Sequence, residues 1–465
     1  MVGLLTKIIA LKRSERLNIT QLQALERERF IQLLRHVMHA SPFYRRYYKE
    51  HGIGVEVIPK VAPHDLPPVT KEMLMAHYDE VVTHGDLTRT KLEQFIFDPA
   101  SRGRKYLGHY QVIHTSGTTG IPALFVYDRN AWDLVRALSI TRVAKTPLHI
   151  FRKRRIAFFG AVDGHYAGVS LVEDAPTFLF KLLSLSINSP LPDIVHRLNE
   201  FQPDMVTGYA SGLTMLAEEK SKGSLKITPT RLISSGEMLT LAMSRTIRNA
   251  FGLEPVNFYA ASESLSMAAQ CALHRGLHLF TDWHCFEVVD KALRPVEAGR
   301  PGTMLLTNLY NFTQPLIRYR MNDEVVLDPG PCSCGSPFPR IKSIAGRVED
   351  FLWFETQKGR EYIHAAAIDE FFVPGLQKFQ VIQTSPASLT MKAVIRGREN
   401  RVLEAIRGKM REILSAKRLD GLVAFEVTAV NDIPNDPKTG KFRFIIPFKA
   451  AKSAQKKTLE HDTPA

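Results

Sequence analysis

The sequence contains few cysteines and no long apolar segment. Its 465 residues include four cysteines, which cannot form the disulfide framework of a small secreted protein. No run of about 18 apolar residues occurs, so no transmembrane helix is expected. The first 13 residues hold a short apolar stretch that Lys7 interrupts, without a small-residue cleavage site, so we expect no secretory signal. These absences favour a cytoplasmic protein.

Motifs of nucleic-acid binding are also missing, although the chain is basic. A formal net charge of +14 attracts phosphate-rich partners, among which nucleic acid, ATP and coenzyme A are candidates. The chain has no zinc-finger spacing, no aromatic ribonucleoprotein motif and no basic heptad pattern, so we expect no nucleic-acid partner. Much of the excess charge lies in residues 13–46 and 449–457. There we favour solvated surface over a binding patch.

The alternation of short apolar runs with amphipathic stretches predicts an α/β fold with a mostly parallel sheet. The expected strands are residues 155–159, 205–207, 231–234 and 256–259, with helices between them such as 209–222 and 244–251. Residues 302–309, 316–319 and 324–327 have strand character without intervening helices, which indicates an antiparallel or barrel-like part.

The chain is longer than one hydrophobic core usually supports, so several domains are expected. Near residue 347 the pattern changes to a strand at 351–355, a helix at 365–372, and then strand, helix and strand. We predict a large, multi-part N-terminal domain (1–346) with parallel sheets and the barrel-like part. A small, mobile α+β C-terminal domain (347–450) and a disordered tail (451–465) follow.

A stretch rich in serine, threonine and glycine follows the apolar residues 110–113. It contains Thr115, Ser116, Gly117, Thr118, Thr119 and Gly120. Glycines permit close backbone approach, and hydroxyl groups donate hydrogen bonds to phosphate oxygens. On composition alone a triphosphate cradle and a flexible linker fit equally well. No Gly-Lys-Ser/Thr sequence closes the stretch, so it is not the common P-loop.

This stretch and five later segments, in the same order, resemble the adenylate-forming superfamily of acyl-CoA synthetases, and within it the phenylacetate-CoA ligase group. The later segments are 235–237, 259–263, 318–323, 346–350 and 439–443. The resemblance covers nearly the whole chain and implies that residues 115–120 hold the phosphates of ATP. Ala123 stands where many members of the superfamily have lysine, and the phenylacetate-CoA ligase group also tends to lack that lysine.

The resemblance implies roles for single residues of these segments. Ser235, Gly236 and Glu237 line the adenine pocket; Tyr259 stacks near adenine in a motif that includes Ser262 and Glu263; Asp323 accepts hydrogen bonds from the ribose. Glu263 holds Mg²⁺, Arg347 contacts the nucleotide, Glu349 occupies the hinge, and the catalytic Lys441 reaches the carboxylate and the α-phosphate. Ala260 and Asn322 replace glycines of the family pattern. Taken singly, each segment also fits an ordinary surface turn.

The function that the resemblance implies is ATP-dependent activation of a carboxylic acid, of an aromatic class, followed by thioester formation with coenzyme A. Two alternatives remain open. The acyl group could pass to the phosphopantetheine of a carrier protein or to an amine, or the chain could be a nucleotide-binding accessory protein without catalysis. No Gly-x-Ser-x-Gly segment occurs, so a hydrolase lacks its signature.

Two cysteine-containing pairs have spacings that can clamp a metal ion. Cys271 and His274 are separated by two residues, and Cys332 and Cys334 by one. Three thiolates and one imidazole make a closed, tetrahedral structural Zn²⁺ site, and relatives in the phenylacetate-CoA ligase group have similar Cys-x-Cys-Gly segments. Four ordinary buried side chains are the alternative, because sequence spacing cannot show that the fold joins the two pairs.

Overall fold

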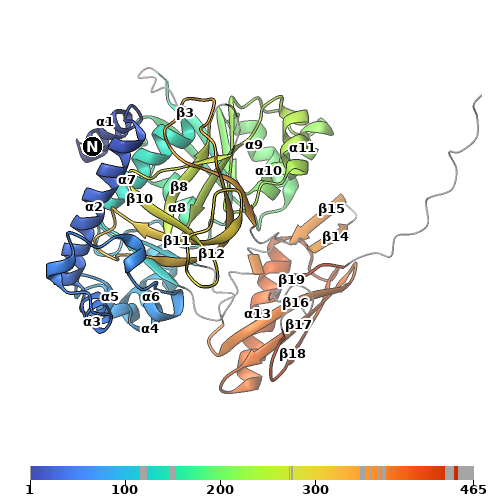
Figure 1. Ribbon diagram of the computed structural model, residues 1–465. Helices are drawn as coiled ribbons and strands as arrows, with labels where there is room; N and C mark the ends of the chain where they lie inside the picture. Colours follow the sequence, from blue (N-terminus) through green and yellow to red (C-terminus); the bar gives the residue numbers. More distant parts are fainter. Residues whose placement is uncertain are drawn as a thin grey trace, which may run out of the picture. The chain divides into compact units, whose positions relative to one another are not determined.

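The computed structural model describes residues 2–115, 123–145, 152–271, 273, 276–345, 352–356, 359–363, 367–368, 373–434 and 445–448. These residues form two compact units, one ending at residue 345 and the other starting at residue 352 (Figure 1). Each unit has its own hydrophobic core. Within the described ranges, no helix is both long enough and apolar enough to cross a bilayer.

The large unit begins with a set of helices. They are α1 (Val2–Ser14), α2 (Ile19–Ala40), α3 (Pro42–Glu50), α4 (Lys71–Ala76), α5 (Tyr78–Val81) and α6 (Arg89–Phe97). Asn18 caps α2 in a capping box with Gln21, because its side chain accepts the Gln21 N–H and the Gln21 side chain accepts the Asn18 N–H. Helix α2 then buries Phe30 and Leu33 in the core of the large unit.

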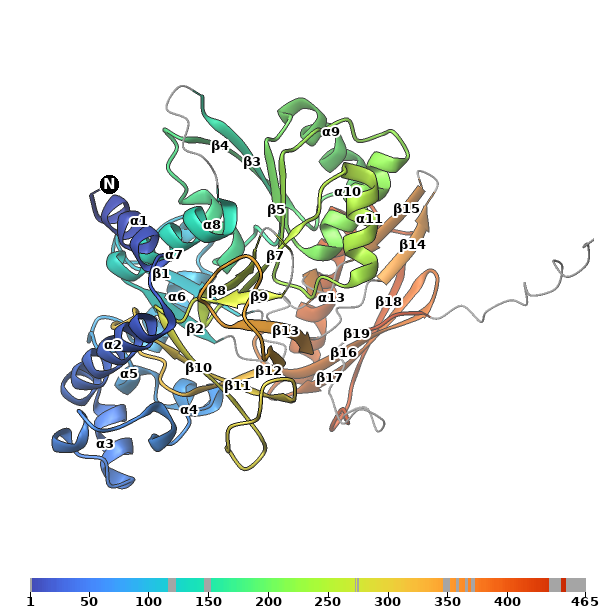
Figure 2. The ribbon, with the colours of Figure 1, turned by 45° about the horizontal axis from the view of Figure 1, so that its top comes forward.

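The parallel part of the large unit confirms the predicted alternation of strands and helices. Its strands are β3 (Arg154–Gly160), β4 (Phe180–Ser186), β5 (Met205–Gly208), β6 (Arg231–Ser235) and β7 (Val256–Ala261), in the order β7-β6-β5-β3-β4. Between them lie α8 (Ala167–Glu173), α9 (Leu191–Phe201), α10 (Ala210–Ser221) and α11 (Leu241–Phe251). Figure 2 shows α9, α10 and α11 on one face of these strands, and α8 with α7 (Arg129–Leu138) on the other. The carboxyl ends of the parallel strands therefore lie along the same side of the sheet, which is where ligands bind in open α/β sheets.

An antiparallel part continues the same sheet beyond β7. It consists of β8 (Ser264–Gln270), β9 (Leu277–Leu279), β10 (His284–Val289), β11 (Pro301–Asn308), β12 (Tyr319–Asp328) and β13 (Arg340–Ala345). All eleven strands form one sheet, in which the antiparallel strands follow the order β10-β11-β12-β13-β9-β8. The strand expected at 324–327 lies within β12 (Tyr319–Asp328), whereas the strand expected at 316–319 was wrong, because residues 316–318 precede β12 and form no strand.

A buried ion pair fastens the end of α1 to the rest of the large unit. The two terminal nitrogens (Nη1 and Nη2) of Arg142, which lies in the π-helical turn η4 (Ser139–Ala144), donate to the two carboxylate oxygens of Asp282 at 2.7 Å. The hydroxyl of Ser14, the last residue of α1, donates to Asp282 at 2.8 Å. Arg142 and Asp282 are 4% and 0% exposed, so water does not screen the pair.

Among its described residues, the small unit contains a hairpin, a four-stranded sheet and the long helix α13. The hairpin joins β14 (Leu352–Thr356) and β15 (Gly359–Ile363). The sheet has the order β18-β17-β16-β19, with β16 (Leu376–Ser385), β17 (Ser388–Ile395), β18 (Ala424–Ala429) and β19 (Ile445–Ile446). Helix α13 (Glu399–Ala416) buries Ile406 and Met410 in the core of this unit, which gives the predicted α+β class. The helix expected at 365–372 falls mostly outside the described residues.

Candidate functional site

The predicted phosphate-binding stretch begins at the end of a short hairpin. Strands β1 (Gln111–His114) and β2 (Leu124–Tyr127) pair in antiparallel fashion, with His114 opposite Leu124. The N–H of Thr115 donates to the carbonyl of Ala123, and the N–H of Ala123 donates to Oγ1 of Thr115, both at 2.9 Å. The two ends of the stretch are therefore fixed at a defined separation. Its middle, with Ser116, Gly117, Thr118, Thr119 and Gly120, lies outside the described residues.

His165 holds this hairpin from a second side. The N–H of His114 donates to the carbonyl of His165 at 3.1 Å, and Nε2 of His165 lies 2.8 Å from the hydroxyl of Ser101. Burial lowers the pKa of His165 to about 4, so the ring is neutral at pH 7. The backbone before Thr115 is thus anchored by buried, uncharged hydrogen bonds, which were not predicted from the sequence.

Two tyrosines bind two carboxylates where β7, β8 and β12 meet. The hydroxyl of Tyr259 donates to Asp323 at 2.6 Å, and the hydroxyl of Tyr319 donates to Glu263 at 3.2 Å. We call these four residues the carboxylate edge. Glu263 occupies the turn between β7 and β8, and Asp323 lies within β12, which pairs with neither of these strands, so the two tyrosine hydrogen bonds join segments about 60 positions apart in the sequence. Each tyrosine uses one oxygen of its carboxylate, which leaves acceptor capacity for a ligand.

The electrostatic environment of Glu263 is unusual for a glutamate. Burial raises its pKa above the ordinary value, and the negative charge of Asp323 acts in the same direction. The hydroxyl of Tyr319 and the positive charge of Lys71, the first residue of α4, oppose this rise. A buried carboxylate whose charge is only partly compensated favours a cation, which fits the predicted Mg²⁺ ligand. The motif at 318–323 includes Tyr319, but no role was predicted for it, and no sequence pattern pointed to Lys71.

The segment after β6 forms a tight turn beside α10. Gly236 has a φ of +79°, and a Cβ atom there would lie 2.9 Å from the ring of Tyr209, so only glycine fits. The carboxylate of Glu237 accepts hydrogen bonds from the N–H and the hydroxyl of Ser211, both at 2.9 Å, in the first turn of α10. Glu237 therefore fixes the turn that follows Ser235.

The remaining predicted nucleotide and hinge residues divide into two groups. The carbonyl of Ser262 accepts a hydrogen bond from the hydroxyl of Tyr127 at 2.8 Å, which ties the Tyr259–Glu263 segment to β2. Arg347, Glu349 and Lys441 lie outside the described residues, so their predicted roles stay predictions.

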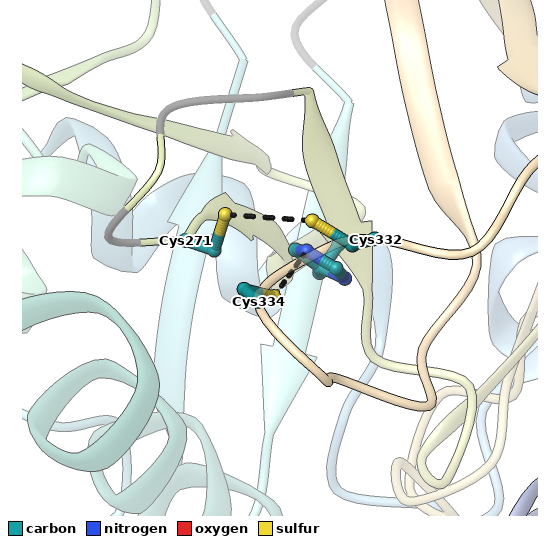
Figure 3. Close-up of side chains that lie close together, drawn as sticks. Cys271, Cys332 and Cys334 are labelled. Carbon is teal, nitrogen blue, oxygen red and sulfur yellow. Dashed lines mark hydrogen bonds between the residues drawn. The ribbon is translucent and has the colours of Figure 1, made fainter.

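The cysteines of the predicted metal site do come together, in a cluster with one histidine. The ligand atoms of Cys271, His278, Cys332 and Cys334 all lie within 4.8 Å of one another. The sulfur atoms of Cys271 and Cys332 are 3.9 Å apart, and the Cys334 sulfur is 3.5 Å from Nε2 of His278 (Figure 3). In a tetrahedral Zn²⁺ site with bonds of about 2.3 Å to sulfur, neighbouring sulfurs are about 3.8 Å apart. We call these four residues the thiol cluster, and its dimensions fit Zn²⁺.

The histidine of the thiol cluster is His278, whereas the sequence spacing favoured His274, which lies outside the described residues. Nδ1 of His278 is 3.0 Å from the carbonyl of Phe338, which orients the ring and leaves Nε2 to face the sulfurs. Burial lowers the pKa of His278, so the ring is neutral, as a metal ligand must be. The pairing of β8 with β9 places His278 opposite Ala269, two residues before Cys271, and this pairing could not be inferred from spacing.

Comparisons with known proteins place the chain beside acid-CoA ligases. Phenylacetate-coenzyme A ligase of Thermus thermophilus is 26% identical over 349 residues, which are 71% of this chain and 72% of that protein. Phenylacetate-coenzyme A ligase of Escherichia coli strain K12 is 25% identical over 73% of this chain and 74% of that protein. Protein CapK of Staphylococcus aureus is 23% identical over 91% of this chain and 88% of its own length. No family model matches the chain.

Solved structures confirm the fold. The crystal structure of 2-hydroxyisobutyryl-CoA ligase in complex with 2-HIB-AMP and CoA, in the thioesterification state, superposes with a TM-score of 0.60. The match covers 93% of this chain and 91% of that protein, at 22% identity. An open conformation of the same ligase superposes with a TM-score of 0.55. The fold is thus that of an adenylate-forming ligase, and the resemblance to the phenylacetate-CoA ligase group indicated by the motifs is confirmed.

Proposed function

We propose that this chain activates a carboxylic acid with ATP and transfers the acyl group to the thiol of coenzyme A. The observation that carries the proposal is the carboxylate edge, where Glu263 and Asp323 come together through the hydroxyls of Tyr319 and Tyr259. One carboxylate for a cation and one for a pair of ribose hydroxyls are the acceptors that an ATP-dependent ligase needs. The names of the relatives, four of which are phenylacetate-CoA ligases of different organisms, support this function and an aromatic acid.

The reaction has two steps. In the first, a carboxylate oxygen of the acid attacks the α-phosphorus of ATP, pyrophosphate leaves, and an acyl-adenylate forms. In the second, the sulfur of coenzyme A attacks the carbonyl carbon, the thiol proton is lost, and AMP leaves. Positioning and electrostatic stabilisation supply most of the acceleration in such phosphoryl chemistry. Asp323 orients the ribose, the Thr115 hairpin presents the phosphate-binding stretch, and Lys441 neutralises charge at the α-phosphate.

Two metal ions belong to the proposal. Mg²⁺ bound by Glu263 would neutralise the phosphates of ATP, and the elevated pKa of Glu263 and its nearby charges fit a cation ligand. Zn²⁺ bound by the thiol cluster would be structural, since three sulfurs and one imidazole leave no coordination position open. Neither ion takes part in a proton transfer in this proposal.

The acceptor of the acyl group is the less supported half of the proposal. Transfer to a carrier protein or an amine would use the same adenylation residues. A non-catalytic accessory role would use nucleotide binding alone. The cytoplasmic location stays a prediction.

An isotope-exchange assay between ATP and pyrophosphate, with a panel of aromatic and aliphatic acids, tests the first step. We expect exchange that depends on the acid and is lost in the Glu263→Gln variant. Parallel reactions with coenzyme A or hydroxylamine then test the acceptor. Formation of a CoA thioester supports the proposal, whereas hydroxamate without any thioester would favour a different acceptor. Absence of exchange with every acid, at saturating ATP and Mg²⁺, would contradict adenylation.

A further inference from the structure

Helix α1 exposes a stripe that is apolar at one end and basic at the other. Residues 5, 9, 12 and 13 follow the spacing i, i+4, i+7 and i+8, which places them on one side of α1, and Arg16 lies in the turn directly after the helix ends at Ser14. Leu5 and Ile9 are both 52% exposed. Lys12, Arg13 and Arg16 are exposed and form no ion pair with any described carboxylate. We call these five residues the α1 stripe.

The opposite side of α1 is firmly packed. Leu4 and Leu11 are 7% and 0% exposed and belong to the core of the large unit, where α1 lies against α7 (Figures 1 and 2). Ser14 fastens the end of the helix to Asp282. The first 14 residues contain no acidic side chain, and Glu15 lies 3.5 Å from Arg142. The α1 stripe is therefore presented on a fixed helix, and nothing on that helix neutralises its charge.

We propose that the α1 stripe docks the protein on an anionic lipid surface. A helix with exposed leucine and isoleucine beside lysine and arginine is suited to the interface of a bilayer, where apolar side chains enter the headgroup boundary and cations meet lipid phosphates. Two half-exposed aliphatic side chains and three cations give weak and reversible binding at the bilayer surface, without insertion of the helix. This binding should weaken as the salt concentration rises. This inference goes beyond the ligase activity and does not depend on it.

The charge of the α1 stripe favours a lipid surface over a second copy of the chain. In a symmetric dimer the same patch contributes from both copies, so the three cations of each stripe would lie near those of the other. Like charges across an interface are unfavourable, which argues against a second copy. An anionic bilayer offers many negative groups and an apolar layer below them, and so complements both ends of the stripe.

Sedimentation of the full chain with sucrose-loaded vesicles tests the proposal. The vesicles contain phosphatidylcholine alone or with 30 mol% phosphatidylglycerol, in about 0.1 M and about 0.5 M salt. The variants are Leu5→Ser with Ile9→Ser, and Lys12→Gln with Arg13→Gln and Arg16→Gln. A matched control, Arg401→Gln with Arg407→Gln and Arg411→Gln, removes the same charge from exposed positions of α13. Circular dichroism melting curves verify that each variant is folded.

We expect the unmodified chain to bind the anionic vesicles at low salt only. Each neutralised cation should weaken partitioning about fivefold, so the triple α1 variant should bind about 100-fold more weakly and the α13 control should not change. The serine variant should bind about tenfold more weakly. Equal binding to neutral vesicles, an equal loss in the control, or no binding at all would overturn the proposal. A change of oligomeric mass in the α1 variants without any vesicle binding would assign the stripe to self-association instead.

Discussion

The carboxylate edge and the thiol cluster lie at opposite ends of the same strands and differ in how their side chains are held. Strand β8 starts directly after Glu263 and ends directly before Cys271, and its seven residues span about 20 Å. Strand β12 likewise begins with Tyr319 and leads toward Cys332. At the carboxylate edge each acid has a hydroxyl partner and spare acceptor capacity. In the thiol cluster the ligand atoms converge on one point. The first arrangement suits a changing ligand, and the second suits a permanent ion.

The largest expected effect is that of Glu263→Gln. The substitution keeps the shape and the hydrogen bond to Tyr319 but removes the charge that a cation needs, so acid-dependent pyrophosphate exchange should fall at least about 100-fold. Because the thiol cluster is a separate site, the Zn²⁺ content measured by mass spectrometry should stay the same. Loss of Zn²⁺ along with the activity would show that the two ends of β8 are not independent.

Asp323→Asn should have the next largest effect. An amide accepts hydrogen bonds less strongly than a carboxylate, so kcat/KM for ATP should fall about 30-fold, with most of the change in KM. Tyr259→Phe removes only the hydroxyl that holds Asp323 and should cost less than about tenfold. If the tyrosine variant is as damaged as the aspartate variant, the tyrosine itself contacts the ligand.

Exchanges in the thiol cluster should change stability more than rate. Cys332→Ser should lower the Zn²⁺ content, and it should lower the melting temperature by about 10 °C. The rate of pyrophosphate exchange at 20 °C should stay within about threefold of that of the unmodified chain. His278→Gln should behave in the same way. His274→Gln, the matched control, should retain Zn²⁺. The opposite result for the two histidines would restore the ligand set expected from the sequence.

The smallest effect is a change in the pH dependence. Glu263 must be ionised to bind a cation, and burial raises its pKa, so activity should rise with pH through that pKa. Lys71→Met removes a positive charge that lowers this pKa, so the acidic limb of the pH profile should move to higher pH. Rates on the acidic limb of the profile should therefore fall more than rates on its alkaline plateau. A uniform loss at all pH values would assign Lys71 another role.

The sequence predicted those parts of the site that lie within short segments. Tyr259 and Glu263 belong to one motif and Asp323 to another, so the resemblance to the family's motifs was enough to select them, and their roles stay predictions. The hydrogen bond from Tyr319 to Glu263 and the charge of Lys71 depend on contacts between distant elements, which no spacing encodes. His278 was missed for the same reason, because its approach to Cys271 results from the pairing of β8 with β9. The alternation of strands and helices, in contrast, is a local property and was predicted correctly.

The buried pair of Arg142 and Asp282 has a practical consequence for shortened versions of the protein. Deleting the first 14 residues would remove the hydrogen bond from the Ser14 hydroxyl to Asp282. It would also remove Leu11 and expose the core residues that Leu11 covers. Losing a buried hydrogen bond to a charged group costs roughly 1.5–3 kcal/mol, a large part of the stability of a typical domain, and the lost packing of Leu11 adds to it. Helix α1 is therefore needed for stability and should not be deleted. An affinity tag is better added before Met1 than put in place of α1.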